Sequence, residues 1–249
     1  MSLPRPLHAL TAAALVAAAA LGPAGTAGAV GGAAVPPLPS ADQLKSALLT
    51  ANDLGPGYTE APATPSPGPS ANPTPVTGCD ALNALINMHA TAPDPATPRA
   101  ETELDGPDGN PMVTEALAAE DSGRLTADVN TVADALKTCH TITFGSAIGE
   151  TVTFTVTPVT LGDRPDAPAA RLDGTLAGVQ LNAFVGVERF GTVGLAYGYF
   201  QRQGADPQAA AMQYRSAVAK IERTLGTTAG STTPPTATAT ATATQGTSV

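Results

Sequence analysis

The chain has 249 residues, a formal net charge of −9, 24 prolines, 25 glycines and no tryptophan. An acidic chain without a basic cluster is a poor partner for nucleic acid or an anionic membrane surface, because both carry negative charge themselves. Composition therefore argues against those two binding classes, and the length is sufficient for a domain with a real core.

The first 29 residues have the three parts of a secretory signal peptide. Arg5 and His8 give a weakly basic start, an apolar run follows at 10–21, and Ala27-Gly28-Ala29 offers small residues for cleavage. The apolar run has 12 residues, whereas a membrane-spanning helix needs roughly 20. We therefore expect a secreted chain without a membrane anchor, beginning at Val30 with eleven basic and 21 acidic residues, a net charge of −10.

Three stretches of biased composition frame or interrupt the expected domain. We interpret residues 30–39 as a flexible leader. The uncharged, Thr/Ala-rich residues 227–249 should form a disordered tail, because they have almost no large apolar side chain to bury. Residues 55–77 contain seven prolines, which exclude regular helix and strand and predict a surface loop within the domain. The folded domain should thus span 40–226.

The start of the domain is expected to be helical. Ser40 is an N-cap residue for a helix through about Leu49, whose leucines share one side. A second helix is predicted from Cys79 to Met88. Prolines then punctuate the chain before a short strand at 99–104.

The clearest helix covers the segment LTADVNTVADALKTC at 125–139. Its apolar residues recur at spacings of four and three, which is typical of an amphipathic helix and aims Cys139 at the core. The chain has two cysteines, and in a secreted protein Cys79 and Cys139 should form a disulfide. The alternatives, a metal site or a reactive thiol, lack further ligands at suitable spacing.

After Cys139 the apolar period changes to two, which indicates β-strands. The segment TVTFTVT at 151–157 predicts a half-buried strand, because threonines alternate with apolar residues. Gly191 marks a tight hairpin between the last two strands. Further strands are expected at 170–176, 178–188 and 192–200.

A last helix completes the predicted domain. Asp206-Pro207 places a cap residue and an N1 proline in their preferred order, and the helix should run to Leu225 before Gly226 ends it. Helices, then an antiparallel meander, then a helix predict an α+β fold. We expect an antiparallel sheet of about five to six strands with helices packed on one face and one disulfide.

The known catalytic and metal-binding motifs are missing from the sequence. His89 and His140 could act as bases, but both also read as residues at helix C-termini. The segment 105–110 looks like a calcium loop, yet Pro107 and Ala116 occupy positions where ligands are needed. A Gly/Asp turn between two extended segments is favoured. We expect no enzyme activity, no cofactor and no metal.

Aromatic residues gather between residues 190 and 200, in the last hairpin, where four of the nine in the chain are found. Such a cluster either packs in the core, the commoner role, or lines an apolar cleft for a ligand. In the second case the ligand would lie on the concave face of the sheet. The candidate ligand-binding residues are then Arg189, Phe190, Tyr197 and Tyr199.

Four sequence features together carry a family resemblance. They are ALLTANDLGPGYT at 47–59, GCDALNAL at 78–85, the helix ending in KTC at 137–139, and VERFGTVGLAY at 187–197. With these features, residues 40–226 resemble the PknH-like extracellular sensor domains of actinobacteria. The resemblance implies an α+β sandwich with a cleft and a non-enzymatic sensing role, here in a secreted member without a kinase. Known members commonly carry two disulfides, whereas this chain can form one.

We therefore expect a secreted ligand-binding or sensor-like module of the actinobacterial cell envelope. Its partner would be an unknown small molecule or envelope component. An envelope lipid carrier is the first alternative, and a cell-wall hydrolase of unrecognised type is the second. A purely structural or adhesive role also remains open.

Overall fold

The structure is a computed structural model that describes residues 37–61, 76–82, 97–145 and 151–235. The expected signal peptide and most of the expected leader lie outside these ranges. So do most of the Pro-rich loop and most of the helix expected after Cys79, of which only 80–82 are described and are helical.

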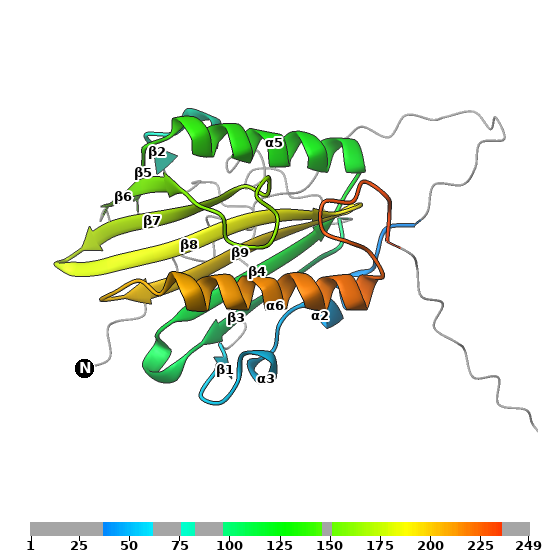
Figure 1. The fold of residues 1–249 in the computed structure, drawn as a ribbon, viewed down its shortest axis with the longest axis horizontal. Coiled ribbons are helices and arrows are strands. Elements are labelled where there is room, and N and C mark those ends of the chain that lie inside the picture. The colour runs from blue at the N-terminus through cyan, green and yellow to red at the C-terminus, as the bar shows by residue number, and fades with distance from the viewer. Residues whose placement is uncertain (1–36, 62–75, 83–96, 146–150, 236–249) are drawn as a thin grey trace, which may run out of the picture.

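One antiparallel sheet of nine strands forms the centre of the fold, in the order β1-β3-β4-β9-β8-β7-β6-β5-β2 (Figure 1). The first strands are β1 (Thr59–Glu60), β2 (Val76–Thr77), β3 (Arg99–Asp105) and β4 (Met112–Ala119). The others are β5 (Thr141–Gly145), β6 (Thr151–Pro158), β7 (Ala169–Leu176), β8 (Val179–Phe190) and β9 (Val193–Arg202).

The expected count of five to six strands was too low, for local reasons. β4 has the sequence MVTEALAA, rich in residues that favour helices. Its helix propensity therefore gave no indication of a strand. Only two residues separate β5 from the helix before it, and they include no turn signal. β1 and β2 have two residues each, too few to show any period. Neither strand contains one of the prolines that made us expect a loop throughout 55–77.

The helices begin and end at recognisable residues. They are α2 (Ala41–Ala47), α3 (Ala51–Leu54), α5 (Ser122–Thr138) and α6 (Pro207–Leu225), with a 3-10 turn at Pro107–Gly109 between β3 and β4. Ser40 caps α2 in a capping box with Gln43. The helix expected through Leu49 stops at Ala47, because Leu48 is extended and Thr50 caps α3. The expected cap and stop residues of α6, Asp206 and Gly226, are confirmed.

The central hairpin, β8–β9, presents two different faces. Its residues pair in register from Leu181↔Arg202 to Phe190↔Val193, and neighbouring side chains point to opposite sides of the sheet. One face carries bulky side chains, the other mainly small ones. The bulky set comprises Phe184, Phe190, Val193, Leu195, Tyr197 and Tyr199; the other set includes Ala183, Val185, Val187, Gly194, Ala196 and Gly198.

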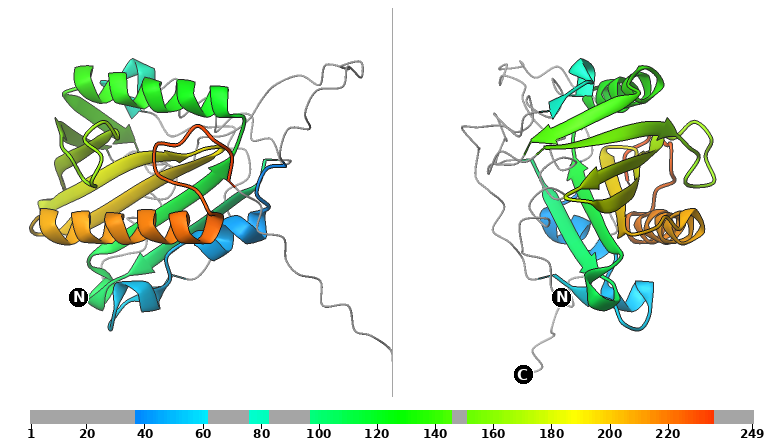
Figure 2. Two further views of the ribbon diagram at one scale, coloured as in Figure 1. Left: turned by 45° about the vertical axis from the view of Figure 1, so that its right-hand side comes forward. Right: turned by 90° about the vertical axis from the view of Figure 1, so that its left-hand side faces the viewer.

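Helices cover both faces of the sheet, rather than the one face expected. Tyr214 of α6 packs edge-on against Tyr197, with ring centroids 5.3 Å apart. Leu125 of α5 instead lies against Gly194, which points to the opposite side. Figure 2 shows the two helices well apart, α5 at the β5–β6 end and α6 across the middle of the sheet. The domain therefore has two cores, one on each side.

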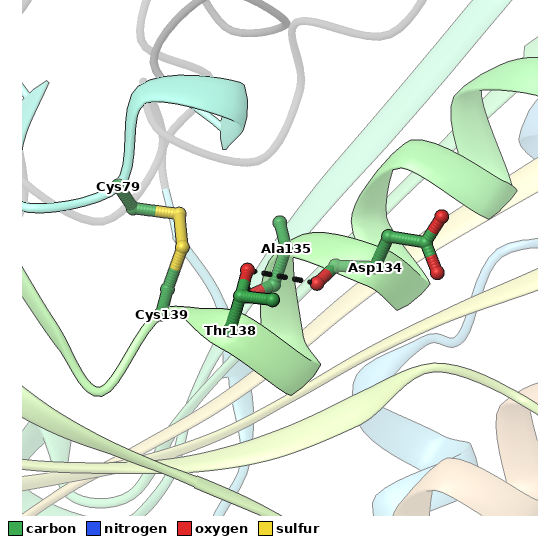
Figure 3. Close-up of a disulfide and its surroundings, with 5 residues drawn as sticks. All are labelled: Cys79, Asp134, Ala135, Thr138 and Cys139. Carbon is green, nitrogen blue, oxygen red and sulfur yellow. Dashed lines mark hydrogen bonds between the residues drawn. A yellow bond between two sulfur atoms is a disulfide. The ribbon is translucent and has the colours of Figure 1, made fainter.

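The expected disulfide between Cys79 and Cys139 is formed, with Cα atoms 5.4 Å apart (Figure 3). Cys139 follows the last residue of α5, and its N–H donates to the carbonyl of Ala135 at 2.7 Å. Cys79 lies two residues after β2. The bridge therefore ties the end of α5 to the β2 edge of the sheet.

The packed chain continues past Gly226 into residues that we expected to belong to the tail. Residues 227–235 lie against the β8–β9 turn, where the Gly191 N–H donates to the carbonyl of Ser231 at 2.9 Å. Gly191 has a φ of +68°, and a Cβ there would stand 2.0 Å from the carbonyl oxygen of Thr233. Glycine is thus required both by the turn and by the segment seated on it.

We expect removal of the disulfide to destabilise the domain by about 2–4 kcal/mol, because it closes a long loop in the unfolded chain. The change is Cys79→Ala with Cys139→Ala, and the measurement is equilibrium unfolding in urea. The unaltered protein in reducing agent is the matched comparison and should lose a similar amount. Unchanged stability in both would contradict a structural role for the bridge.

Candidate functional site

The three aromatic residues expected to contact a ligand lie inside the core. Phe190, Tyr197 and Tyr199 are 0%, 0% and 2% exposed and face α2 and α6. The Tyr197 hydroxyl points at the carbonyl of Ala210 in α6 at 3.5 Å. A ligand would reach these rings only by displacing a helix, and their role in binding stays a prediction.

Arg189 is separated from those rings because it lies on the other side of the sheet. It is half-buried, and its guanidinium donates to the Thr126 hydroxyl of α5 and, at 3.2 Å, to the carbonyl of Gly230. The structure therefore does not bring the four predicted residues together. Arg189 connects β8, α5 and the C-terminal segment.

The accessible part of the sheet's middle is the side that faces α5. On this side Thr114, Ala116 and Ala118 of β4 and Gly194 and Ala196 of β9 are half-buried, whereas the residues that alternate with them on the α6 side are buried. We define the α5-side surface as these half-buried residues together with Val187 of β8, none of which has a long side chain. They are Thr114, Ala116, Ala118, Val187, Gly194 and Ala196.

This surface ends where β4 leads into α5. Glu120 follows β4, and its N–H donates to the carbonyl of Thr192 at 2.8 Å. Asp121 caps α5 by accepting from the N–H groups of Gly123 and Arg124. One turn of helix therefore brings Arg124 back to Glu120, with Nε and Oε2 3.6 Å apart.

Two more charged residues complete the group. Asp128 is one turn beyond Arg124 and faces inward from α5, where it is buried. Arg99 begins β3 beside Ala118 of β4. We call Glu120, Arg124, Asp128, Arg99 and Thr192 the charged corner.

Burial controls the ionisation of the charged corner. Glu120 is 5% exposed, and burial, reinforced by the nearby charge of Asp128, raises its pKa to about 7. The positive charges of Arg124 and Arg99 oppose that shift. Burial likewise raises the pKa of Asp128.

The charged corner also has unused hydrogen-bonding capacity. Among the described residues, neither carboxylate oxygen of Glu120 accepts a hydrogen bond, and the Thr192 hydroxyl makes none. Buried polar groups normally have partners, and an unsatisfied one costs about 1–3 kcal/mol. The corner is thus prepared to accept hydrogen bonds from a molecule with hydroxyl or ammonium groups.

Other candidate chemistry is weaker in the described part of the chain. No group of three or more His, Cys, Asp or Glu residues there is placed to hold a metal ion. His140 is exposed in the short connection before β5, and His89 lies outside the described residues. The expected turn after Asp105 is confirmed, since it joins β3 to β4.

Sequence reasoning missed the charged corner because Glu120 looked like one of many surface carboxylates. One signal was present. Asp128 falls three residues after Leu125, within the apolar stripe of the predicted helix, where a charge has no place unless it meets a partner.

A further buried carboxylate belongs to the other side of the sheet. Glu115 of β4 is 1% exposed, and its Oε2 accepts from the N–H of Leu49 at 2.7 Å. Burial raises its pKa to about 7. It secures the connection between α2 and α3 against the sheet, which is a structural role.

No family model and no curated protein matches the sequence. One solved structure with a similar fold is the extracellular domain of PknH from Mycobacterium tuberculosis, with a TM-score of 0.54 and 16% sequence identity. The match covers 76% of this chain and 97% of that one. The chain therefore has a fold like that of the PknH extracellular domain. No described helix is both long and apolar enough to cross a membrane.

The raised pKa of Glu115 predicts a loss of stability as pH rises. Its ordinary pKa of 4.5 applies in the unfolded chain and about 7 in the fold, so the folded state holds the proton more tightly. Its contribution is complete below pH 4.5 and is lost as pH rises through 7, on the order of 3 kcal/mol.

Glu115→Gln should flatten this part of the profile in urea unfolding between pH 4 and pH 8. The matched control is Glu101→Gln, at an exposed position of β3, which should keep the unaltered slope. Equal slopes in all three proteins would show that Glu115 ionises freely in the fold.

Proposed function

We propose that this chain is a secreted, non-enzymatic ligand-binding module of sensor type in the actinobacterial cell envelope, with its ligand at the charged corner. The observation that carries the proposal is Glu120, a buried carboxylate whose oxygens accept no hydrogen bond from the described residues. The similar fold of the PknH extracellular domain supports a sensor-like role. The disulfide supports export, because such bonds persist in oxidising compartments.

The chemistry of the corner favours a ligand with hydrogen-bond donors. Glu120 and the hydroxyl of Thr192 can both accept, and Arg124 at 3.6 Å leaves room for a stronger partner to Glu120. Since burial raises the pKa of Glu120, an ammonium or hydroxyl donor would stabilise the ionised carboxylate and lower that pKa again. Binding and ionisation would thus be linked.

The position of the corner explains how binding would affect the whole domain. It joins β4 to α5, and Arg189 beside it links α5 to the C-terminal segment. The far end of α5 is fixed by the disulfide. A ligand that contacts both β4 and α5 would therefore restrain the N-terminal end of α5, whose C-terminal end the disulfide already holds.

We expect a component of an actinobacterial envelope extract to raise the thermal unfolding temperature. Separate lipid, glycan and peptidoglycan-fragment fractions serve as probes. A ligand at a hundred times its Kd stabilises the folded state by about 2.7 kcal/mol. Glu120→Gln should abolish the shift, because an amide cannot replace the charge that the donors meet, while Glu101→Gln should keep it.

Two outcomes would overturn the proposal. A flat response to every fraction would remove the binding function. A full shift in the Glu120→Gln protein would move the ligand away from the charged corner. Release of bound acyl chains on solvent extraction of native protein would favour the lipid-carrier alternative instead.

A further inference from the structure

The end of the sheet farthest from β1 carries a face that the proposed function does not use. It is the α6 side of β5–β8, which extends beyond the strands that α6 covers. A row of polar side chains crosses it from strand to strand, joined by the register of the sheet. We call this set the polar row: Thr141, Thr155, Asp173, Asn182 and Gln201.

A line of threonines runs along β6 and crosses the polar row at Thr155. The four threonines of this strand are exposed, while the residues between them face the α5 side and are buried or half-buried. The hydroxyl of Thr153 bonds that of Thr143 on β5 at 2.7 Å. The exposed threonines of β6 are Thr151, Thr153, Thr155 and Thr157.

This face carries no net charge, in contrast to the rest of the protein. β2, β5 and β6 contain no charged residue in a chain of net charge −9. Arg171 and Asp173 of β7 neutralise each other, with Nη2 and Oδ1 2.9 Å apart. Proteins usually protect sheet edges with charges; here hydroxyl groups take that place. A charged polymer would find no opposite charges on this face, whereas a neutral polymer does not need them.

Asn182 gives the row an acceptor that the described residues leave unused. It is 1% exposed, its Nδ2 donates to Asp173, and its Oδ1 accepts no hydrogen bond. The guanidinium carbon of Arg171 lies 5.9 Å from the centroid of the Phe184 ring, on the same side of the sheet as Asn182. Buried amide oxygens normally accept a hydrogen bond, so the row has unused acceptor capacity at this position.

The spacing of the face is regular in both directions. Adjacent strands lie about 4.8 Å apart, and alternate residues along a strand lie about 6.7 Å apart. Each threonine hydroxyl both donates and accepts. A polymer with hydroxyl groups repeated along its edges can therefore meet several of these positions at once. From this geometry we propose that the polar row and the β6 threonines bind a neutral, hydroxyl-rich glycan chain.

Co-sedimentation with insoluble glycans tests this site directly. The probes are cellulose, amylose and mannan, all uncharged, and the full secreted protein should sediment with at least one of them. Thr153→Val with Thr155→Val removes two hydroxyls but keeps branched side chains suited to a strand. We expect this double change to weaken binding at least tenfold.

The matched control is Thr114→Val, which removes a hydroxyl from the α5-side surface and should leave sedimentation unchanged. A second variant, Thr155→Lys, adds a charge at the centre of the face and should abolish binding even if the double variant folds poorly. No sedimentation with any of the three glycans, or equal binding by all variants, would overturn the site. Glu120→Gln should bind glycan normally, so this inference and the proposed function can fail separately.

Discussion

The register of the β8–β9 hairpin is the constraint on which the rest of the structure depends. Pairing from Leu181↔Arg202 to Phe190↔Val193 puts Tyr197 and Tyr199 of β9 on one side and the two glycines of β9 on the other. A slip of one residue would reverse both sets. The tight turn at Gly191, held by the carbonyl of Ser231, fixes that register. The two different faces of the domain follow from this one hairpin.

Each face then serves a different purpose. The bulky face provides the main core, where Tyr197 meets α6 and Glu115 holds the α2–α3 connection. The opposite face, under α5, is half-open and ends at the charged corner. There Glu120 is buried with its oxygens unsatisfied by the described residues. The larger core lies on one side of the hairpin, and the smaller core on the other side leaves the surface near the charged corner half-buried.

The sequence predicted this architecture where local signals are strong. The period of two after Cys139, the amphipathic stripe of α5, the disulfide and the cap of α6 were all readable, and the α+β class follows from them. β4 was not, because its alanines and Glu115 favour helix until tertiary pairing overrides them. The charged corner was not either, since Glu120 and Asp128 approach only after β4 and α5 have packed. The aromatic residues of the hairpin suited either the core, the commoner role, or a cleft, and only the placement of α6 shows them buried.

The most direct test of the central claim is an NMR titration of alanine methyl groups with a compound that stabilises the protein. Ala116, Ala118 and Ala196 lie on the α5-side surface, whereas Ala210 and Ala217 are buried in α6. If the ligand binds beside the charged corner, the first three methyl signals move during the titration and the last two stay in place. Movement confined to Ala210 and Ala217 would contradict the account, because the ligand would then enter the core beneath α6.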